Sequence, residues 1–243
     1  MRNEDIVKLK NNFDRDGFVL IRKFYSSSKI KLIKKNLFKH LEKIKHKLKK
    51  RQIHFTDSKL INSVHHLKWE KMNEIRNNKK ILNIVKTLLR DKVKHFGAEV
   101  FAKPAKYGLK VPIHQDNFYW NVDNSKGLTV WIALDKSIKK NGAIFYYKKT
   151  HKLGLLNHKS SYAPGSSQKL KNLNILKKFK KTMPNLNVGD ILIHHCLVVH
   201  GSMKNLSNND RTGLTMRYIG KSSKILISSK SNYEKELKKQ LLN

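Results

Sequence analysis

The spacing of apolar residues changes about ninety residues into the chain. Before that point a long stretch, residues 29–51, repeats them every three or four positions, which is the period of a helix. The positions are Ile30, Leu32, Ile33, Leu37, Leu41, Ile44 and Leu48. After Asp91 the apolar stretches are short, rich in β-branched and aromatic residues, and bounded by Gly, Asn, Asp or Pro, as strands typically are. Helices followed by a run of strands predict an α+β protein, with a β-sandwich or barrel packed against helices.

The same pattern predicts where the individual elements lie. Helices are expected at residues 4–12, 27–50 and 68–90, and a buried strand at 17–24. Further strands are expected in residues 93–104, 127–135, 142–149, 189–200 and 212–219. The polar, lysine-rich segment 160–184 has a turn sequence at 164–167 and is expected to be a surface loop of the kind that often covers an active site. We predict one domain over residues 1–225, helical to about residue 90 and strand-rich over 91–220, followed by a helix at 226–243.

The composition fits a globular enzyme. A chain of 243 residues is long enough to bury a full core and most simply forms one domain. The sequence contains no run of eighteen apolar residues, so we expect no membrane-spanning helix. Its first ten residues carry charges where a signal peptide needs apolar residues. The single cysteine, Cys196, has no partner for an internal disulfide and fits a reducing compartment, so a cytoplasmic protein is predicted.

The formal net charge of +36 invites a different interpretation. Clustered positive charge favours nucleic acids and anionic surfaces, because binding them releases counterions. The 45 lysines far outnumber the 8 arginines, however, whereas proteins that read bases rely on the arginine fork. The lysines are spread along the chain with many Asn and Ile, a pattern typical of codon bias in an AT-rich genome. We expect the lysines of residues 29–51 to form a solvated helix face, with an anion-binding surface as the alternative.

Two histidines and a carboxylate have the clearest chemistry. His114 and Asp116 are two positions apart, and in a strand such side chains point to the same face. His200 supplies a remote second imidazole. Two histidines and one carboxylate form the facial triad that binds iron(II) in non-haem oxygenases and leaves coordination positions open. The His-x-Asp pair by itself is weak evidence, because twelve histidines produce such spacings by chance.

An arginine follows the second histidine and supplies a positive charge for an anionic ligand. Arg211 lies eleven residues after His200, at the start of an otherwise apolar stretch, and its guanidinium does not deprotonate. A dicarboxylic cosubstrate needs such a cation at its far end. Ser202 is expected to donate its hydroxyl to the same carboxylate, and Arg217 is the alternative cation.

Five segments in a fixed order carry a family pattern: FDRDGFVLIRKF, FAKPAKYGLKVPIHQDNFYW, GLTVWIALD, NGAIFYYKKTHKLG and VGDILIHHCLVVHGSMKNLSNNDR. Over about residues 10–220 the chain resembles the phytanoyl-CoA dioxygenase family of iron(II)- and 2-oxoglutarate-dependent oxygenases, in motif order and in the His-to-Arg interval. The resemblance implies a double-stranded β-helix, a cupin-like jelly-roll that keeps the metal in its mouth, with the N-terminal helices packed on one side.

The resemblance also implies roles for individual residues. The iron ligands match His114, Asp116 and His200. Arg211 matches the residue that pairs with the distal carboxylate of 2-oxoglutarate, and Ser202 matches a residue that assists it. Trp131 matches an aromatic position that lines the cosubstrate pocket. Thr129 shares a strand face with Trp131 and is expected to line the same site.

Some positions depart from the family pattern. Ile113 stands where a Trp often precedes the first ligand, and Lys148 and Lys149 replace a usual Pro-Gly. These departures concern the substrate and the loops, because none of the three is a ligand position. Halogenating relatives carry Ala or Gly in place of the carboxylate, so the presence of Asp116 favours hydroxylation.

Residues near the ligands are further candidates. Substrate contacts are expected at Asn117, Tyr119 and Trp120, with ordinary packing at the barrel mouth as an equal alternative. His195 resembles a histidine that is common in the family just before the second histidine ligand, and it is expected to support a ligand or the structure without binding metal, while the role of the adjacent His194 stays open. His65 and His66 are placed in a helix or lid segment and their roles stay open. Cys196 is expected to be a buried strand residue with no catalytic part.

The sequence thus predicts a hydroxylase that converts 2-oxoglutarate to succinate and carbon dioxide while oxidising a small molecule. Acyl-CoA, an amino-acid derivative and a secondary metabolite all remain possible substrates, and Lys103, Lys106 and Lys110 would suit an anionic one. No specific nucleic-acid partner is expected, and the oligomeric state stays open. Two other functions remain as alternatives: a cupin-like metal protein that does not use 2-oxoglutarate, and a basic nucleic-acid-binding protein on a related barrel.

Overall fold

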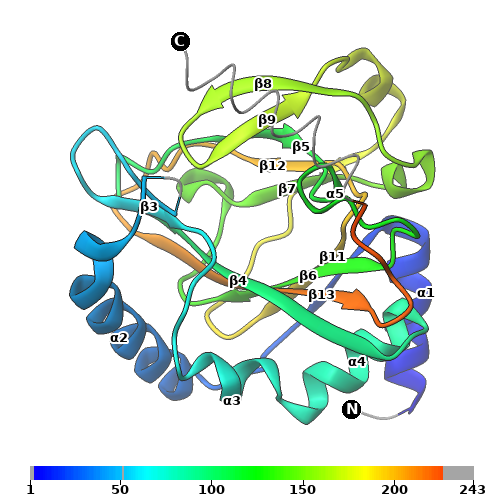
Figure 1. The fold of residues 1–243 in the computed structure, drawn as a ribbon, viewed down its shortest axis with the longest axis horizontal. Helices are drawn as coiled ribbons and strands as arrows, with labels where there is room; N and C mark the ends of the chain where they lie inside the picture. Colours follow the sequence, from blue (N-terminus) through cyan, green and yellow to red (C-terminus); the bar gives the residue numbers. More distant parts are fainter. Residues whose placement is uncertain (1–2, 51, 227–243) are drawn as a thin grey trace.

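The computed structural model describes residues 3–50 and 52–226, drawn in Figure 1. The α-helices are α1 (Asn3–Asp16), α2 (Ser27–Ile44), α3 (Met72–Arg76), α4 (Lys79–Leu89) and α5 (Asn117–Trp120). Single 3-10 turns lie at Lys45–Lys47, Lys139–Asn141, Thr150–Leu153 and Asn174–Lys178. The strands are β1 (Phe18–Ile21), β2 (Ile53–Phe55), β3 (Ile61–Val64), β4 (Val93–Lys103), β5 (Val111–His114), β6 (Gly127–Ala133), β7 (Ile144–Tyr147), β8 (His158–Ala163), β9 (Ser166–Leu170), β10 (Lys181–Thr182), β11 (Ile191–His195), β12 (His200–Ser202) and β13 (Arg211–Gly220).

Two antiparallel sheets lie face to face (Figure 1). The larger has the strand order β1-β11-β6-β13-β4-β3-β2, and the smaller has the order β10-β7-β12-β5. Apolar side chains from both sheets pack together between them, including Phe18 and Trp131 from the larger sheet and Tyr146 from the smaller. The rings of Phe18 and Tyr146 stack with their centroids 4.4 Å apart. This is a jelly-roll, so the predicted α+β class and the predicted fold are confirmed.

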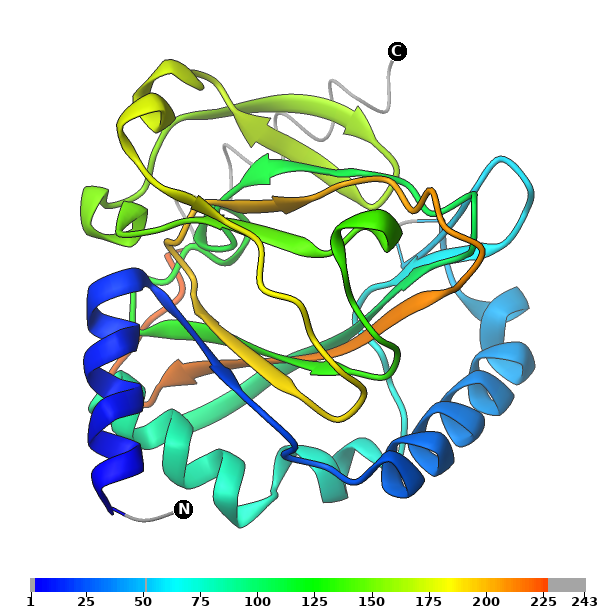
Figure 2. The same ribbon diagram turned by 180° about the vertical axis from the view of Figure 1, so that it is seen from behind.

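The N-terminal helices cover the outer side of the larger sheet, as Figure 2 shows. The apolar positions of α2 that face the sheet are buried: Ile30, Ile33, Leu37 and Leu41. They belong to one cluster with α4 and with the outward side chains of β6, Leu128, Val130 and Ile132. The helical period read from the sequence therefore identifies the face of α2 that packs, although Leu32, which shares that stretch, is 54% exposed.

Around β13 and β4 the inner side of the larger sheet is polar although it is buried. Every residue of β13 is buried, and the alternation of the strand directs Leu214 towards the helices and its neighbours Thr215 and Arg217 towards the smaller sheet. Thr215 pairs across the sheet with Glu99 of β4, and Arg217 pairs with Thr129 of β6. Buried polar groups are costly unless they find partners, so this inner face is where the chemistry of the molecule is expected to lie.

The structure corrects three of the predicted elements. The helix expected at 68–90 is two helices: α3 ends at Arg76 with Asn77 as its C-cap, and Asn78 caps α4, its side chain accepting hydrogen bonds from the amides of Lys80 and Ile81. The strand expected at 189–200 is two strands, β11 and β12, separated by a tight turn in which the Val198 amide donates to the His195 carbonyl. The N-terminal part is not wholly helical, since β2 and β3 extend the larger sheet at its edge.

The segment predicted as a surface loop, residues 160–184, instead contains most of a hairpin. Strands β8 and β9 pair with each other, and Pro164 and Gly165 form the two-residue turn between them. Gly165 has a φ of +70°, in the left-handed region that favours glycine. The predicted turn is therefore present, but the chain around it is regular.

Two predictions concern the ends of the chain and membrane association. All but the first residue of the helix expected at 226–243 lies outside the described residues. Within residues 3–50 and 52–226, no helix has the length and apolar character that crossing a membrane requires.

Candidate metal centre

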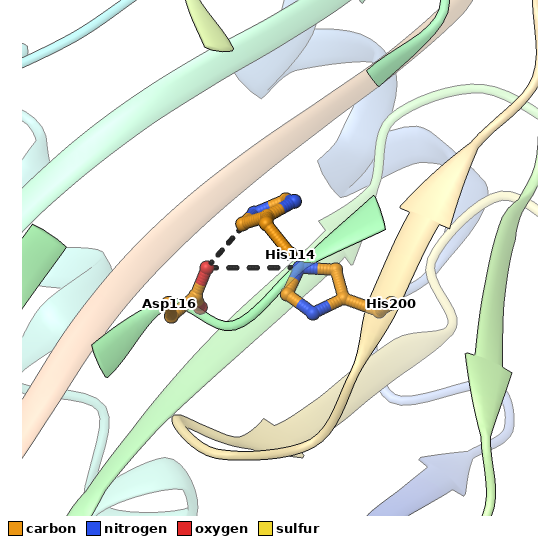
Figure 3. Close-up of side chains that lie close together, drawn as sticks. All are labelled: His114, Asp116 and His200. Atoms are coloured by element: carbon orange, nitrogen blue, oxygen red, sulfur yellow. Dashed lines mark ion pairs between the residues drawn. The ribbon is translucent and has the colours of Figure 1, made fainter. Parts of the chain in front are cut away.

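The two histidines and the carboxylate singled out in the sequence lie together between the sheets (Figure 3). His114 ends β5 and His200 begins β12, and the two residues are direct partners across the antiparallel pair. Their ring centroids are 4.4 Å apart. One possible ligand atom from each of His114, Asp116 and His200 lies within 4.8 Å of the others. Neighbouring strands thus bring together residues that are 86 positions apart in the chain, from 114 to 200.

Asp116 reaches the cluster by a different route from the one expected. Strand β5 stops at His114, and Asp116 has the helical dihedral angles φ −59° and ψ −37° immediately before α5. The alternation of side chains along a strand therefore does not align it with His114. The turn from the strand to the short helix brings Asp116 to His114 instead. The two residues were expected to lie together, but the reason expected, strand alternation, was wrong.

Both histidines are held in the tautomer that a metal ligand needs. The Nδ1 atom of His114 lies 2.8 Å from the carbonyl oxygen of Pro112, and the Nδ1 atom of His200 lies 3.0 Å from that of Val198. A carbonyl only accepts hydrogen bonds, so Nδ1 carries the proton in each ring and Nε2 keeps its lone pair. Those Nε2 atoms lie 3.5 Å and 3.6 Å from Oδ1 of Asp116.

The two oxygens of Asp116 have different surroundings. Oδ1 faces the two imidazoles, whereas Oδ2 accepts a hydrogen bond of 2.8 Å from the hydroxyl of Thr129 and lies 3.0 Å from Nε2 of His194. His194 in turn has its Nδ1 atom 2.9 Å from the hydroxyl of Tyr146. One oxygen is thus held by the protein and the other is left to a metal ion, as supporting hydrogen bonds to a ligand commonly arrange.

The charges at the cluster suit a divalent cation. Burial alone would raise the pKa of Asp116, but the imidazoles of His200, His114 and His194 outweigh it and hold the pKa well below its ordinary value. Burial lowers the pKa of His200 to about 3, helped by His114. The carboxylate is therefore ionised and His200 neutral near pH 7, the states in which both donate electron pairs to a metal.

The side chains of the two adjacent histidines of β11 point to opposite faces of the strand. His194 is the one that contacts the carboxylate, with its Nε2 atom 3.0 Å from Oδ2 of Asp116. His195 points to the other side of the strand, where its ring lies 5.8 Å from that of Phe13 and 5.4 Å from that of His151, centroid to centroid. Sequence reasoning favoured His195 by its resemblance to the family pattern, but the alternation of the strand gives that place to His194.

The hydrogen bonds to Asp116 lead to a testable expectation. In the variant His194→Phe, Oδ2 of Asp116 loses one of its two anchoring contacts, so the carboxylate is less well oriented. We expect the affinity for iron(II) to fall by about 10–100-fold, as is common when such supporting residues are removed. A competition titration against a chelator measures it. His195→Phe is the matched control, and an equal loss of affinity in both variants would mean that the contact has no special role.

Arg211 lies on the inner face, within reach of the same cluster. It is 1% exposed, and its guanidinium carbon lies 4.9 Å from the centre of the Trp131 ring. Among the described residues, its Nε and Nη2 atoms have no hydrogen-bond partner. Burial lowers the pKa of Arg211, but only to about 10, so it stays charged near pH 7. A buried guanidinium with two idle donors fits a carboxylate ligand, because leaving such groups unpaired is costly.

The other residues predicted near the cosubstrate, Trp131, Ser202 and Thr129, have different contacts. Trp131 stacks on Arg211, and Gly213 permits that contact, because a Cβ atom there would overlap the indole. Ser202 is buried two residues after His200, on the same face of β12. Thr129 donates a hydrogen bond of 2.8 Å to Oδ2 of Asp116, and its place beside the cosubstrate stays a prediction. The donor set as a whole fits an iron ion together with a dicarboxylate.

The three predicted substrate contacts of α5 differ in what they touch. Asn117 is buried, and its amide both donates to and accepts from the backbone of Val122 at 3.1 Å, closing the loop after α5. Trp120 is 6% exposed and lies in an apolar cluster with Cys196. Only Tyr119 lies against the metal cluster, with its ring 5.7 Å from that of His114. Whether any of them binds substrate stays a prediction, but Asn117 and Trp120 have structural partners.

Two residues that matter here were missed in the sequence. Gln115, between the ligands, is fully buried and its side chain binds three backbone groups, those of Gly154, Leu197 and Leu156. Its position between two ligands was the available signal. Glu99 lies 2.8 Å from Nδ1 of His65, which follows strand β3 and not a helix. No pattern in the sequence indicates that residues 65 and 99 lie close together.

The chain is also similar to proteins that are already known. The family model described as phytanoyl-CoA dioxygenase (PhyH) matches residues 13–213, most of the chain. The chain belongs to the phytanoyl-CoA dioxygenase family. Both ligand segments and Arg211 fall inside the matched range, so the family resemblance read from the motifs is confirmed.

The sequence identity between this chain and individual relatives or solved structures is low. A probable alpha-ketoglutarate-dependent hypophosphite dioxygenase of Stutzerimonas stutzeri is 26% identical over 63% of this chain, and the match spans 54% of that relative's length. A phytanoyl-CoA dioxygenase domain-containing protein 1 homolog of Caenorhabditis elegans is 24% identical over 86% of this chain and 88% of its own length. The crystal structure of EctD from S. alaskensis, solved with 2-oxoglutarate and 5-hydroxyectoine, shares the fold with a TM-score of 0.74, at 18% identity over 93% of this chain and 78% of that one.

Proposed function

We propose that this protein is an iron(II)- and 2-oxoglutarate-dependent dioxygenase that hydroxylates a small molecule. Family membership supports this function, and the observation that carries it in this chain is Arg211. A buried cation with two partnerless nitrogens, on the same inner face as two histidines and a carboxylate, is hard to explain unless a carboxylate ligand binds there. A metal-binding cupin that does not use 2-oxoglutarate has no need of it.

Each residue of the site has a distinct part in this proposal. His114, His200 and Oδ1 of Asp116 would hold the iron, while Thr129 and His194 orient the carboxylate through Oδ2. Arg211 would bind the distal carboxylate of 2-oxoglutarate, with the flat face of Trp131 fixing the guanidinium. Iron(II) bound at the three ligands would supply the oxidising chemistry with dioxygen as the oxidant: one oxygen atom would enter succinate as 2-oxoglutarate loses carbon dioxide, and the other would become the hydroxyl of the product. The two sheets keep water away from these groups, which strengthens their electrostatic interactions.

The presence of a carboxylate ligand supports hydroxylation over halogenation, because Asp116 occupies the coordination position that a halide would need. The substrate is proposed to be a small molecule. One relative is named for hypophosphite, and the EctD structure was solved with 5-hydroxyectoine. Both compounds are small and polar, which supports a compact polar substrate for this chain more than a long hydrocarbon.

We also propose that residues 1–225 form a single domain that acts in the cytoplasm. One apolar cluster joins the N-terminal helices to the larger sheet, which supports one domain. The buried free thiol of Cys196 supports a reducing compartment. The lysine-rich surface of α2 is proposed to be solvated, with its apolar side packed on the sheet.

An anaerobic titration tests the proposed function before any substrate is known. Addition of 2-oxoglutarate to the protein with iron(II) is expected to give the visible charge-transfer absorption of a chelated keto acid. Oxygen should then release succinate, faster when a compound from a metabolite panel is a substrate. Iron binding without the absorption band would support the cupin alternative. Failure to bind iron, with salt-sensitive binding to nucleic acid, would support the nucleic-acid alternative.

A further inference from the structure

The hairpin β8–β9 joins the metal-binding loop to the far edge of the larger sheet. At its base, Nε2 of His158 accepts a hydrogen bond of 3.1 Å from the amide of Gln115, between the two ligands of that loop. The His158 ring also stacks on Phe118, with the centroids 4.3 Å apart. At its tip, Gly165 lies against the side chains of Ser63 and His54, which belong to β3 and β2. The hairpin therefore covers the side of the sandwich between β5 and β3 (Figure 1).

One polar side chain of this hairpin is buried without a hydrogen bond. Strand β9 alternates buried and partly exposed side chains, and Gln168 lies on the buried side with Ser166 and Leu170. It is 0% exposed. Among the described residues, neither its amide nitrogen nor its amide oxygen has a hydrogen-bond partner. A buried amide that forms no hydrogen bond costs free energy, so a group from outside the chain is expected to bind it.

Gln168 is also close to the metal cluster. The hydroxyl of Tyr119 accepts a hydrogen bond of 3.0 Å from the backbone amide of Gln168. The ring of the same tyrosine lies edge-on to His114, with centroids 5.7 Å apart. A single tyrosine side chain thus separates the backbone of Gln168 from a proposed iron ligand. Tyr119 therefore links strand β9 to the proposed metal centre, and a molecule bound at the amide of Gln168 would lie in the neighbourhood of that centre.

The neighbouring inner face adds polar groups but no unbalanced charge. Ser63, beside the hairpin tip, is 1% exposed, and among the described residues its hydroxyl has no partner. Next to it, Glu99 is paired with His65 at 2.8 Å and with Arg217 at 3.6 Å. Burial opposes ionisation of Glu99, but Arg217 and His65 prevail and lower its pKa to about 2. The Glu99 anion and the Arg217 cation are paired with each other, although Nε of Arg217 has no hydrogen-bond partner among the described residues, so this region offers further hydrogen bonds and no free anion.

We propose that Gln168 binds an uncharged polar group of the substrate that both donates and accepts hydrogen bonds, such as a carboxamide. Ser63 provides a further hydroxyl at the tip of the hairpin. The substrate class is then a compact polar molecule, not a fatty acyl chain. The inference rests on the proposed function of the metal centre, which places the oxidised carbon of the substrate beside His114.

The test compares Gln168→Met, which keeps the size of the side chain but removes the amide, with the matched control Gln52→Met. Gln52 lies near the surface, where its side chain accepts a hydrogen bond from the Lys49 amide. The probe is propanamide, added anaerobically to the protein with iron(II) and 2-oxoglutarate. Broadening of its proton signals by the paramagnetic iron reports binding close to the metal. Butanone, which only accepts hydrogen bonds, and propanoate, which is charged, are the comparison probes.

We expect propanamide to bind the native protein and Gln52→Met equally, and Gln168→Met at least about tenfold more weakly, which corresponds to one hydrogen-bonded polar group. Butanone and propanoate should bind the native protein more weakly than propanamide. Equal binding of propanamide to all three proteins, or no binding at all, would overturn the inference. The charge-transfer absorption of the native protein separates the two proposals: if the absorption is missing, the proposed function has failed as well.

Thermal unfolding of the metal-free proteins gives a second measurement that needs no ligand. Replacing a partnerless buried amide by a methionine side chain removes an uncompensated cost, so the Tm of Gln168→Met should rise by about 2–4 °C. Gln52→Met should show no rise. A fall in the Tm of Gln168→Met would show that the amide stabilises the fold, which contradicts a role reserved for substrate.

Discussion

The variant Asp116→Asn is expected to lose iron(II) binding and to lower turnover by about a thousandfold or more. The side chain keeps its shape, but the negative charge that faces Nε2 of His114 and of His200 at 3.5 Å and 3.6 Å disappears. A carboxylate ligand and the metal it holds together contribute several kcal/mol to transition-state stabilisation, and each 1.36 kcal/mol is a factor of about ten in rate. Metal analysis after dialysis and succinate release measure the two effects.

The fold of this variant is expected to persist. Because the surrounding imidazoles hold the pKa of Asp116 below its ordinary value, the ionised carboxylate stabilises the metal-free fold, so the Tm of Asp116→Asn should fall by a few degrees while the protein stays folded. Asp57→Asn, at an exposed position, is the matched control and should retain full iron binding. Full turnover in Asp116→Asn would show that the metal ligands lie elsewhere.

The variant Arg211→Met is expected to leave iron binding intact and to weaken 2-oxoglutarate binding by about a hundredfold or more. Loss of one partner of a buried charged hydrogen-bonded pair costs about 2–5 kcal/mol, because the distal carboxylate is then buried without a cation. The affinity is read from the concentration of 2-oxoglutarate that gives half of the charge-transfer absorption. The KM for 2-oxoglutarate should rise with it, while succinate formation at saturation changes less.

Arg217→Met is the matched control, since Arg217 is the other buried arginine on the inner face of β13. Its guanidinium is paired with Glu99 and packs 5.0 Å from the ring centre of Phe96, so its loss should disturb the substrate side and not the cosubstrate. A hundredfold effect in Arg217→Met and none in Arg211→Met would exchange the roles of the two residues. No effect of either variant on 2-oxoglutarate would favour a cupin without that cosubstrate.

The two sides of the site are built from different kinds of contact. On the cosubstrate side, Arg211 and Trp131 are neighbours across adjacent strands, and the lack of a side chain at Gly213 lets them stack. On the proposed substrate side, Tyr119 connects the loop of His114 and Asp116 to Gln168, and the hairpin β8–β9 is held by hydrogen bonds of the same loop. Changes in the hairpin can therefore alter the substrate without altering the iron ligands.

Much of the fold could be predicted because local patterns decide it. The period of apolar residues in α2 selects the face that packs, and the β-branched stretches give β4, β6 and β13. The boundaries that failed are those that depend on single capping residues, as between α3 and α4, where Asn77 is the C-cap of one helix and Asn78 the N-cap of the next. Strands β2 and β3 were not predicted because such short strands depend on their partners more than on their own sequence: β2 pairs with β3, and β3 pairs with β4.

The sequence by itself determined the family, the α+β jelly-roll and the identity of the three proposed ligands. The order and spacing of the motif residues can be recognised without knowing which residues are in contact. Only the tertiary structure decided how the ligands meet: Asp116 is oriented by a turn, and the face of β11 gives His194, not His195, the contact with its carboxylate. The partnerless states of Arg211 and Gln168 likewise belong to the folded molecule, since a hydrogen bond that is not formed leaves no trace in a sequence.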